Sequence, residues 1–128
     1  MPEEHMVSLW AGRADSSQAF KAFLLTGYTE DGDYIPSPFV RDFGIKYYDE
    51  DFREAQYYEK PSRSLRALLN GYSRDYMIIP KFIQLFGEFF PDDVNAVVVW
   101  YRFNYHGRVI INADATVKMR YMGAVPLD

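Results

Sequence analysis

The sequence contains no cysteine and no long apolar run, and its only two histidines are His5 and His106. Without cysteine, disulfides, thiolate metal ligands and a cysteine nucleophile are excluded. A membrane-spanning helix needs about 20 apolar residues in succession, and no stretch approaches that length. The acidic N-terminal residues are not followed by an apolar segment, so we expect no signal peptide. These absences favour a cytoplasmic protein without a membrane partner.

Positive charge is scarce as well. The chain has 14 Lys and Arg residues against 18 Asp and Glu residues, a net charge of −4. Proteins that bind nucleic acid need a basic face, so we expect no nucleic-acid partner, despite Arg102 beside Tyr101 on a predicted strand. The 128 residues are 48% apolar and 18% aromatic, which predicts a single domain over 1–128 with a frayed start at 1–5.

The apolar pattern predicts an α+β fold, in which an antiparallel sheet of about four strands carries three helices, mainly on one face. The predicted strands cover residues 6–11, 95–105, 108–112 and 116–122, with a further short strand at 53–58. The last three long strands form a meander, with a hairpin turn at His106-Gly107. The first helix spans about 16–26, the second begins at Ser62, and the third begins near residue 75.

Single residues set the expected boundaries. Gly12 ends the first strand, Asp15 caps the first helix, and Ser62 caps the second. The core face of the third helix is expected to comprise Tyr76, Ile79, Ile83, Phe86 and Phe90. Pro80 falls within that helix and predicts an irregular start, because its ring clashes with the carbonyl four residues earlier.

Against the low overall charge, residues 26–60 are both acidic and aromatic. They hold nine of the 23 aromatic residues and nine acidic residues against four basic ones. We predict a long loop region over residues 27–60, with a turn at Asp31-Gly32 and a short helical turn capped by Asp49. Aromatic rings anchor interfaces and carboxylates steer a basic partner, so this stretch suits protein binding. The alternative is that the rings belong to the core and the acids form a solvated face.

No catalytic or metal-binding pattern stands out from the residues. The two histidines lack ligand spacing, and Asp31-Gly32-Asp33 lacks the later oxygen ligands of a calcium loop. Asp49, Asp51 and Glu54 are the one carboxylate group that suggests metal-assisted or acid–base chemistry. A small carboxylate enzyme and a homo-oligomeric structural module therefore remain as alternatives to a binding protein.

Several short motifs, taken in order, resemble the immunity protein 22 family of bacterial polymorphic toxin systems. The motifs are Leu9-Trp10-Ala11-Gly12, Ser37-x-Phe39, Asp42-Phe43-Gly44, Tyr48-Asp49-x-Asp51-Phe52-x-Glu54-Ala55, Leu68-Leu69 with Ser73, Tyr101-x-Phe103-x-Tyr105-x-Gly107 and Tyr121-Met122-Gly123-Ala124-Val125-Pro126. The resemblance covers nearly the whole chain. It implies a cytoplasmic bacterial protein of contact-dependent competition that binds a cognate toxin, with no catalysis of its own and no cofactor.

The residues and the resemblance together predict an inhibitor that captures its toxin through an acidic, aromatic surface. A basic nuclease domain is one toxin that such a surface would suit, because nucleases hold phosphates. The predicted contact residues are Tyr47, Tyr48, Asp49, Glu50, Asp51, Glu54 and Tyr57.

Overall fold

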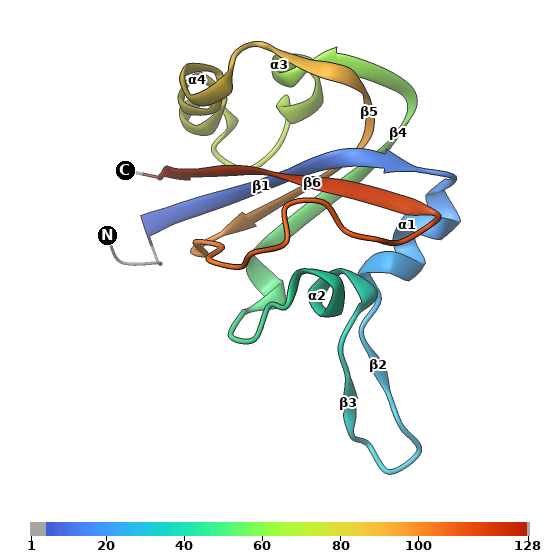
Figure 1. Ribbon diagram of the computed structural model, residues 1–128. Coiled ribbons are helices and arrows are strands. Elements are labelled where there is room, and N and C mark those ends of the chain that lie inside the picture. The colour runs from blue at the N-terminus through green and yellow to red at the C-terminus, as the bar shows by residue number, and fades with distance from the viewer. Residues whose placement is uncertain (1–4, 128) are drawn as a thin grey trace.

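The structure is a computed structural model that describes residues 5–127, and it is built around one four-stranded antiparallel sheet (Figure 1). The strands are β1 (Met6–Ala14), β4 (Arg53–Ser64), β5 (Phe89–Tyr101) and β6 (Val117–Pro126). They lie in the order β4-β5-β1-β6, so β5 and β1 are central. The α-helices of the described residues are α1 (Ser17–Leu24), α2 (Pro38–Phe43), α3 (Leu65–Leu69) and α4 (Asp75–Phe86). This arrangement confirms the predicted α+β class and its four-stranded antiparallel sheet.

The helices cover both faces of the sheet, two on each face, rather than lying mainly on one (Figure 1). On one face, α3 and α4 pack on side chains such as Leu9 and Val97. On the other face, α1 and α2 pack on Trp10 and Val98. Successive strand residues point to opposite faces, and residues 96–100 of β5 are apolar throughout, so both faces need a cover.

The last strand, β6, pairs with β1 and not with β5, which corrects the predicted meander. Strand β5 ends at Tyr101, where Arg102 takes a left-handed conformation with φ of 58°. The predicted turn at His106-Gly107 and the predicted strand over 108–112 lie in the irregular connection of residues 103–116 that follows. Strand β1 is apolar on both faces, as is typical of a central strand. Its two neighbours in the sheet are β5 and β6.

Residues 27–60, predicted as a long loop, instead fold into several short elements. A hairpin comes first, in which β2 (Gly27–Tyr28) pairs with β3 (Tyr34–Ile35). The 3₁₀ turn η2 (Glu50–Phe52), capped by Asp49 as predicted, then leads into β4, which runs from Arg53 to Ser64 instead of ending at residue 58.

Helix α2 lies between the hairpin and η2 and was not predicted. The Ser37 hydroxyl caps it by accepting a hydrogen bond from the Val40 N–H at 3.2 Å. Pro38 opens the helix, and Gly44 follows its last residue with φ of 65°. Serine, then proline, then a closing glycine is the usual signature of a short helix, but this part of the chain was predicted as a loop region.

Two helix caps lie one or two residues later than predicted. Ser16, not Asp15, caps α1 by accepting from the Ala19 N–H, and Ser64, not Ser62, caps α3. Gly12 lies inside β1 and does not end it, and β5 begins at Phe89 rather than at residue 95. Residues 1–4 of the predicted frayed start lie outside the described residues.

Helix α4 contains Pro80, as expected, but its buried face differs from the prediction. Ile78, Ile79 and Phe82 are buried, whereas Tyr76 is 74% exposed. Even this helix has only 12 residues. Within residues 5–127, no helix combines the length and the apolar character that crossing a membrane requires.

Candidate functional site

The predicted contact residues lie where the chain passes from α2 into β4, at one end of the sheet. The segment is attached to β5 through Trp100. The indole N–H of Trp100 donates to the Asp49 carbonyl at 3.0 Å, and the Tyr48 ring meets Trp100 edge-on at a centroid distance of 5.4 Å. The side chain of Asp49 accepts a hydrogen bond from the Asp51 N–H at 3.0 Å, which fixes η2. The segment is therefore a supported surface and not a loose loop.

Only three of the seven predicted contact residues are exposed, namely Tyr47, Asp49 and Asp51. Tyr47 is the most open large apolar side chain among the described residues, at 88% exposed. An aromatic ring with two carboxylates on a rigid turn can meet a partner at low cost in side-chain ordering. These three residues keep the character that the sequence analysis assigned to the whole segment.

Glu50 is half-buried and bonds to the segment that follows α1. Its carboxylate accepts a short hydrogen bond from the Thr26 hydroxyl. Next to it, the Arg53 guanidinium donates to the Leu24 carbonyl at 3.3 Å and lies 5.4 Å from the centre of the Trp100 ring. Burial lowers the pKa of Arg53, and the nearby Glu50 carboxylate opposes that shift. Glu50 is therefore a structural residue that joins η2 to α1.

Glu54 and Tyr57 lie on opposite faces of β4. Glu54 is paired with Val99 of β5, and Tyr57 with Ala96, so the strand alternation turns them apart. The Glu54 carboxylate accepts hydrogen bonds from the backbone N–H and the hydroxyl of Ser73, on the side of α3 and α4. Tyr57 is half-buried against the core on the side of α1 and α2. The seven residues therefore do not form one surface.

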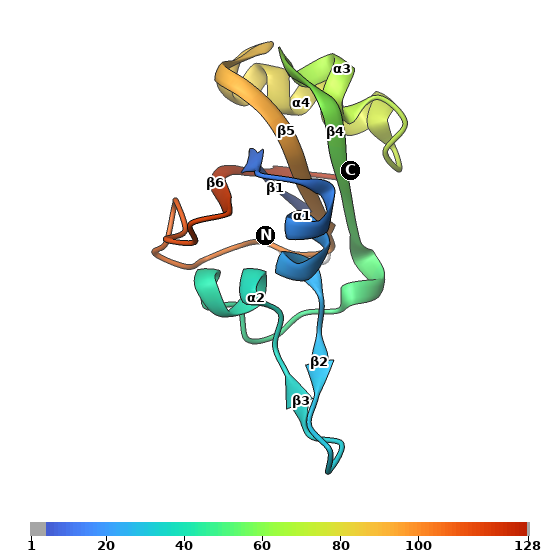
Figure 2. The same cartoon turned by 90° about the vertical axis from the view of Figure 1, so that its right-hand side faces the viewer.

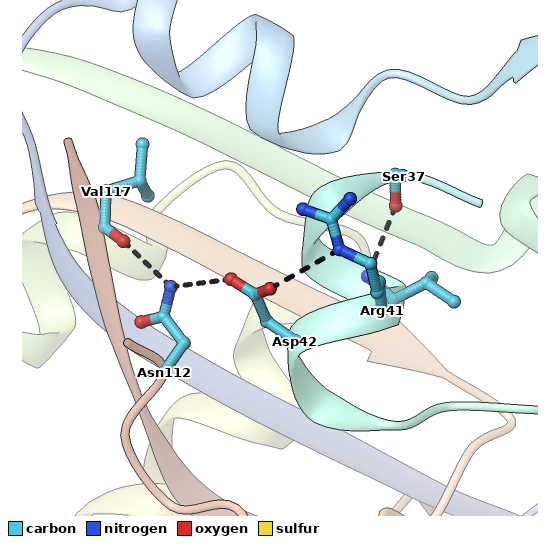
Figure 3. A network of polar contacts seen from close by, with 6 residues as sticks. Ser37, Arg41, Asp42, Asn112 and Val117 are labelled. Atoms are coloured by element: carbon cyan, nitrogen blue, oxygen red, sulfur yellow. Dashed lines mark hydrogen bonds and ion pairs between the residues drawn. The ribbon is translucent and has the colours of Figure 1, made fainter. Parts of the chain in front are cut away.

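Asp42, another acid of the stretch, also has a structural role (Figure 3). Its carboxylate accepts from the Asn112 side-chain amide at 3.3 Å and lies 3.8 Å from the Arg41 guanidinium. The same amide nitrogen donates to the Val117 carbonyl at 2.8 Å. This network holds α2 against the start of β6.

Two surface hollows flank the Asp49–Glu54 segment. One, of about 470 Å³, is lined by Tyr34, Lys46, Tyr48, Asp49 and Glu50. It joins the base of the β2–β3 hairpin to the predicted contact segment, which makes the two a continuous surface.

The second hollow, of about 360 Å³, lies on the α3/α4 side. Its lining includes Asp51, Glu54 and two arginines, Arg74 and Arg102. The two arginines are the only non-glycine residues of the described chain with positive φ, at 56° and 58°. Arg102 lies over the Phe52 ring at 4.8 Å, a cation–π contact that closes one side of the hollow.

The carboxylates proposed for metal-assisted chemistry do not converge. Glu54 turns toward Ser73, whereas Asp49 caps η2. Across residues 5–127, no three His, Cys, Asp or Glu side chains lie close enough together to hold a metal ion. The alternative of a carboxylate enzyme therefore has no ligand cluster in the described part of the chain.

The tyrosines of the hairpin were not among the predicted contact residues. Tyr28 and Tyr34 face each other across β2 and β3, and they are 70% and 48% exposed. The turn at Asp31-Gly32 was predicted, but each strand has only two residues, too short for an alternating pattern to show.

Comparison with known families finds a match that covers almost the entire chain. Residues 7–128 match the family model described as Immunity protein 22. No curated protein and no solved structure matches the chain.

Proposed function

Because this chain belongs to the immunity protein 22 family, we propose that it binds a cognate bacterial toxin domain in the cytoplasm and neutralises it by binding alone. One observation carries the contact surface: Tyr47, Asp49 and Asp51 are exposed on a turn that Trp100 and Asp49 hold in place. A preformed surface suits an inhibitor that must act quickly, because little ordering is needed on binding.

The proposal keeps the seven predicted residues but gives them two roles. Tyr47, Asp49 and Asp51 make contact with the toxin. Tyr48, Glu50, Glu54 and Tyr57 hold the contact turn against the sheet and the neighbouring helices. A toxin with a basic binding face, such as a nuclease domain, would gain in association rate from the acidic residues.

The test uses the toxin domain encoded next to this gene, with growth protection and binding kinetics as measurements. The double variant Tyr47→Ser, Asp51→Lys should weaken binding at least about tenfold, because loss of an aromatic anchor at an interface costs more than about 1.4 kcal/mol. It should also reduce protection at normal expression, and the association rate of the unaltered protein should fall as salt is raised.

A matched control makes the same chemical changes elsewhere. Tyr76→Ser, Glu88→Lys removes one exposed tyrosine and reverses one exposed acid, both outside the contact segment. This control should bind and protect like the unaltered protein. Equal effects of the two double variants would exclude the proposed contact surface, and failure of the unaltered protein to bind the toxin domain would exclude the proposed function.

A further inference from the structure

The β2–β3 hairpin projects away from the body of the protein in two perpendicular views (Figures 1 and 2). None of its residues belongs to either core cluster. A two-stranded hairpin alone is marginally stable in water. Because this hairpin packs on no core, its presence is not explained by a contribution to the folding of the domain.

The hairpin is nevertheless a well-defined structure. Tyr28 pairs with Tyr34, and their rings meet edge-on at a centroid distance of 6.4 Å. Beyond them, the Thr29 N–H donates to the Asp33 carbonyl at 2.9 Å, and the Thr29 hydroxyl accepts from the Asp33 N–H at 3.0 Å. Gly32 completes the turn with φ of 85°. A shape fixed in this way costs little ordering when it docks.

The surface of the hairpin combines apolar area with negative charge. Half of the ten exposed large apolar residues of the described chain lie between positions 25 and 47, namely Leu25, Tyr28, Tyr34, Ile35 and Tyr47. The tip carries Glu30, Asp31 and Asp33, all exposed, and no basic residue stands between Lys21 and Arg41. The negative charge of the tip is therefore not balanced by basic residues nearby in the sequence. The rings of Tyr28 and Tyr34 lie next to the tip.

We propose that the β2–β3 hairpin inserts into a basic cleft of the toxin, where its acidic tip meets the cationic side chains and Tyr28 and Tyr34 fill the cleft mouth. Charge complementarity identifies the occupant, because a tip of three carboxylates repels nucleic acid and anionic membranes. The hollow between Tyr34 and the Lys46–Glu50 segment makes the hairpin continuous with the contact turn. This inference rests on the proposed function, and it adds a second contact element that acts by occlusion.

The test compares two triple charge reversals in binding to the toxin domain encoded next to this gene. Glu30→Lys, Asp31→Lys, Asp33→Lys changes the tip. Glu88→Lys, Asp92→Lys, Asp93→Lys makes the same change in net charge at exposed positions around the start of β5. The strand β5 lies away from the hairpin (Figure 1). The tip variant should lower the association rate at least about tenfold at low salt, and the control should change it less than about threefold.

A second variant tests the rings. Tyr28→Ser, Tyr34→Ser should raise the dissociation rate at least about tenfold, because aromatic anchors act mainly after encounter. Neither hairpin variant should change the melting temperature, since the hairpin supplies no core residue.

The outcomes separate this inference from the proposed function. If the unaltered protein binds the toxin domain and both hairpin variants bind equally well, the inference is overturned and the proposed function stands. An equal loss of association rate in the tip variant and in its control would also overturn the inference, because the total charge of the protein would then be the cause. A dimer of the chain alone that Tyr28→Ser, Tyr34→Ser dissolves would also overturn it, by assigning the hairpin to self-association. If the unaltered protein does not bind, the proposed function fails, and the inference with it.

Discussion

Buried polar side chains join segments that regular pairing leaves open. The Ser8 hydroxyl donates to the Phe103 carbonyl at 2.8 Å and accepts from the Tyr105 N–H at 3.1 Å. The Asn95 side chain bonds both the N–H and the carbonyl of Ala14, at 2.8 and 3.0 Å. Each of these side chains bonds backbone groups that have no strand partner where a ladder ends. A buried group left unpaired there would cost about 1–3 kcal/mol. The irregular parts of the fold are thus as well specified as the ladders.

Gly12 gives the sharpest prediction for a single residue, because β1 and β6 approach closely there. A Cβ at this position would lie 2.0 Å from the carbonyl oxygen of Lys118, which is backbone of the neighbouring strand. Gly12→Ala should therefore lower the free energy of unfolding by about 3 kcal/mol or more, because the strands must separate. Denaturant unfolding followed by circular dichroism measures this change.

Gly27 provides the matched control for that substitution. It also lies in a strand, but a Cβ there would meet the Ile35 side chain at 3.5 Å, an ordinary contact. Gly27→Ala should change the free energy of unfolding by less than about 1 kcal/mol. A Gly12→Ala protein as stable as this control would show that β6 can shift away from β1 without cost.

At the scale of the element, sequence patterns were informative where a segment is long and regular. The apolar run predicted a strand over residues 95–105, which overlaps the observed β5 (Phe89–Tyr101), and Asp49 predicted the cap of η2. The partner of β6 was not predictable, because the strand pattern shows which face is buried but not which strand lies alongside. Helix α2 and the hairpin are too short for periodicity, so only their end signals were available.

The structure places Phe39 and Phe43 of residues 26–60 in the core and leaves Tyr47 exposed. Charge and aromatic content alone marked this stretch as a candidate for partner binding. They could not separate exposed Asp51 from Glu50 and Glu54, because those two carboxylates are satisfied by Thr26 and Ser73. Such partners are distant in sequence and are brought together only by the packing of α1 and α3 around β4.

Pro80 in α4 gives a prediction for an element. Proline has no N–H to donate to the carbonyl of Tyr76, four residues earlier, and Pro80 is exposed on the helix surface. Pro80→Ala should raise the free energy of unfolding by about 1 kcal/mol. The intrinsic helix preference of about 3 kcal/mol is partly offset by the more flexible unfolded chain.

Thermal unfolding of the Pro80→Ala variant, followed by circular dichroism, gives the measurement. Replacing exposed Gln84 in the same helix by Ala serves as the control and should alter the free energy of unfolding by less than about 0.5 kcal/mol. A destabilised Pro80→Ala protein would mean that the proline ring makes a packing contact that outweighs the missing hydrogen bond.

At the scale of the whole molecule, tyrosines link both cores to the surrounding connections. On the α3/α4 side, Tyr58 donates to the Leu68 carbonyl and Tyr101 to the Ser73 carbonyl. On the other side, the Tyr105 hydroxyl lies 2.8 Å from the Val109 carbonyl. Burial raises the pKa of Tyr58, Tyr101 and Tyr105, and it does the same for Tyr72 and Tyr121. The protonated phenol is therefore part of the folded state on both faces of the sheet.

These raised pKa values predict that the protein unfolds in alkali. Above about pH 10 the tyrosines of the unfolded chain lose their protons while the folded protein retains them, so stability falls as pH rises. Circular dichroism and tyrosinate absorbance should then change together in one transition.

The difference in unfolding free energy between the unaltered protein and Tyr101→Phe tests the cause. The unaltered protein should be more stable by about 1 kcal/mol at pH 8, because Tyr101 bonds Ser73, and lose that advantage above about pH 10. Parallel stability curves for the two proteins would exclude Tyr101 as a contributor.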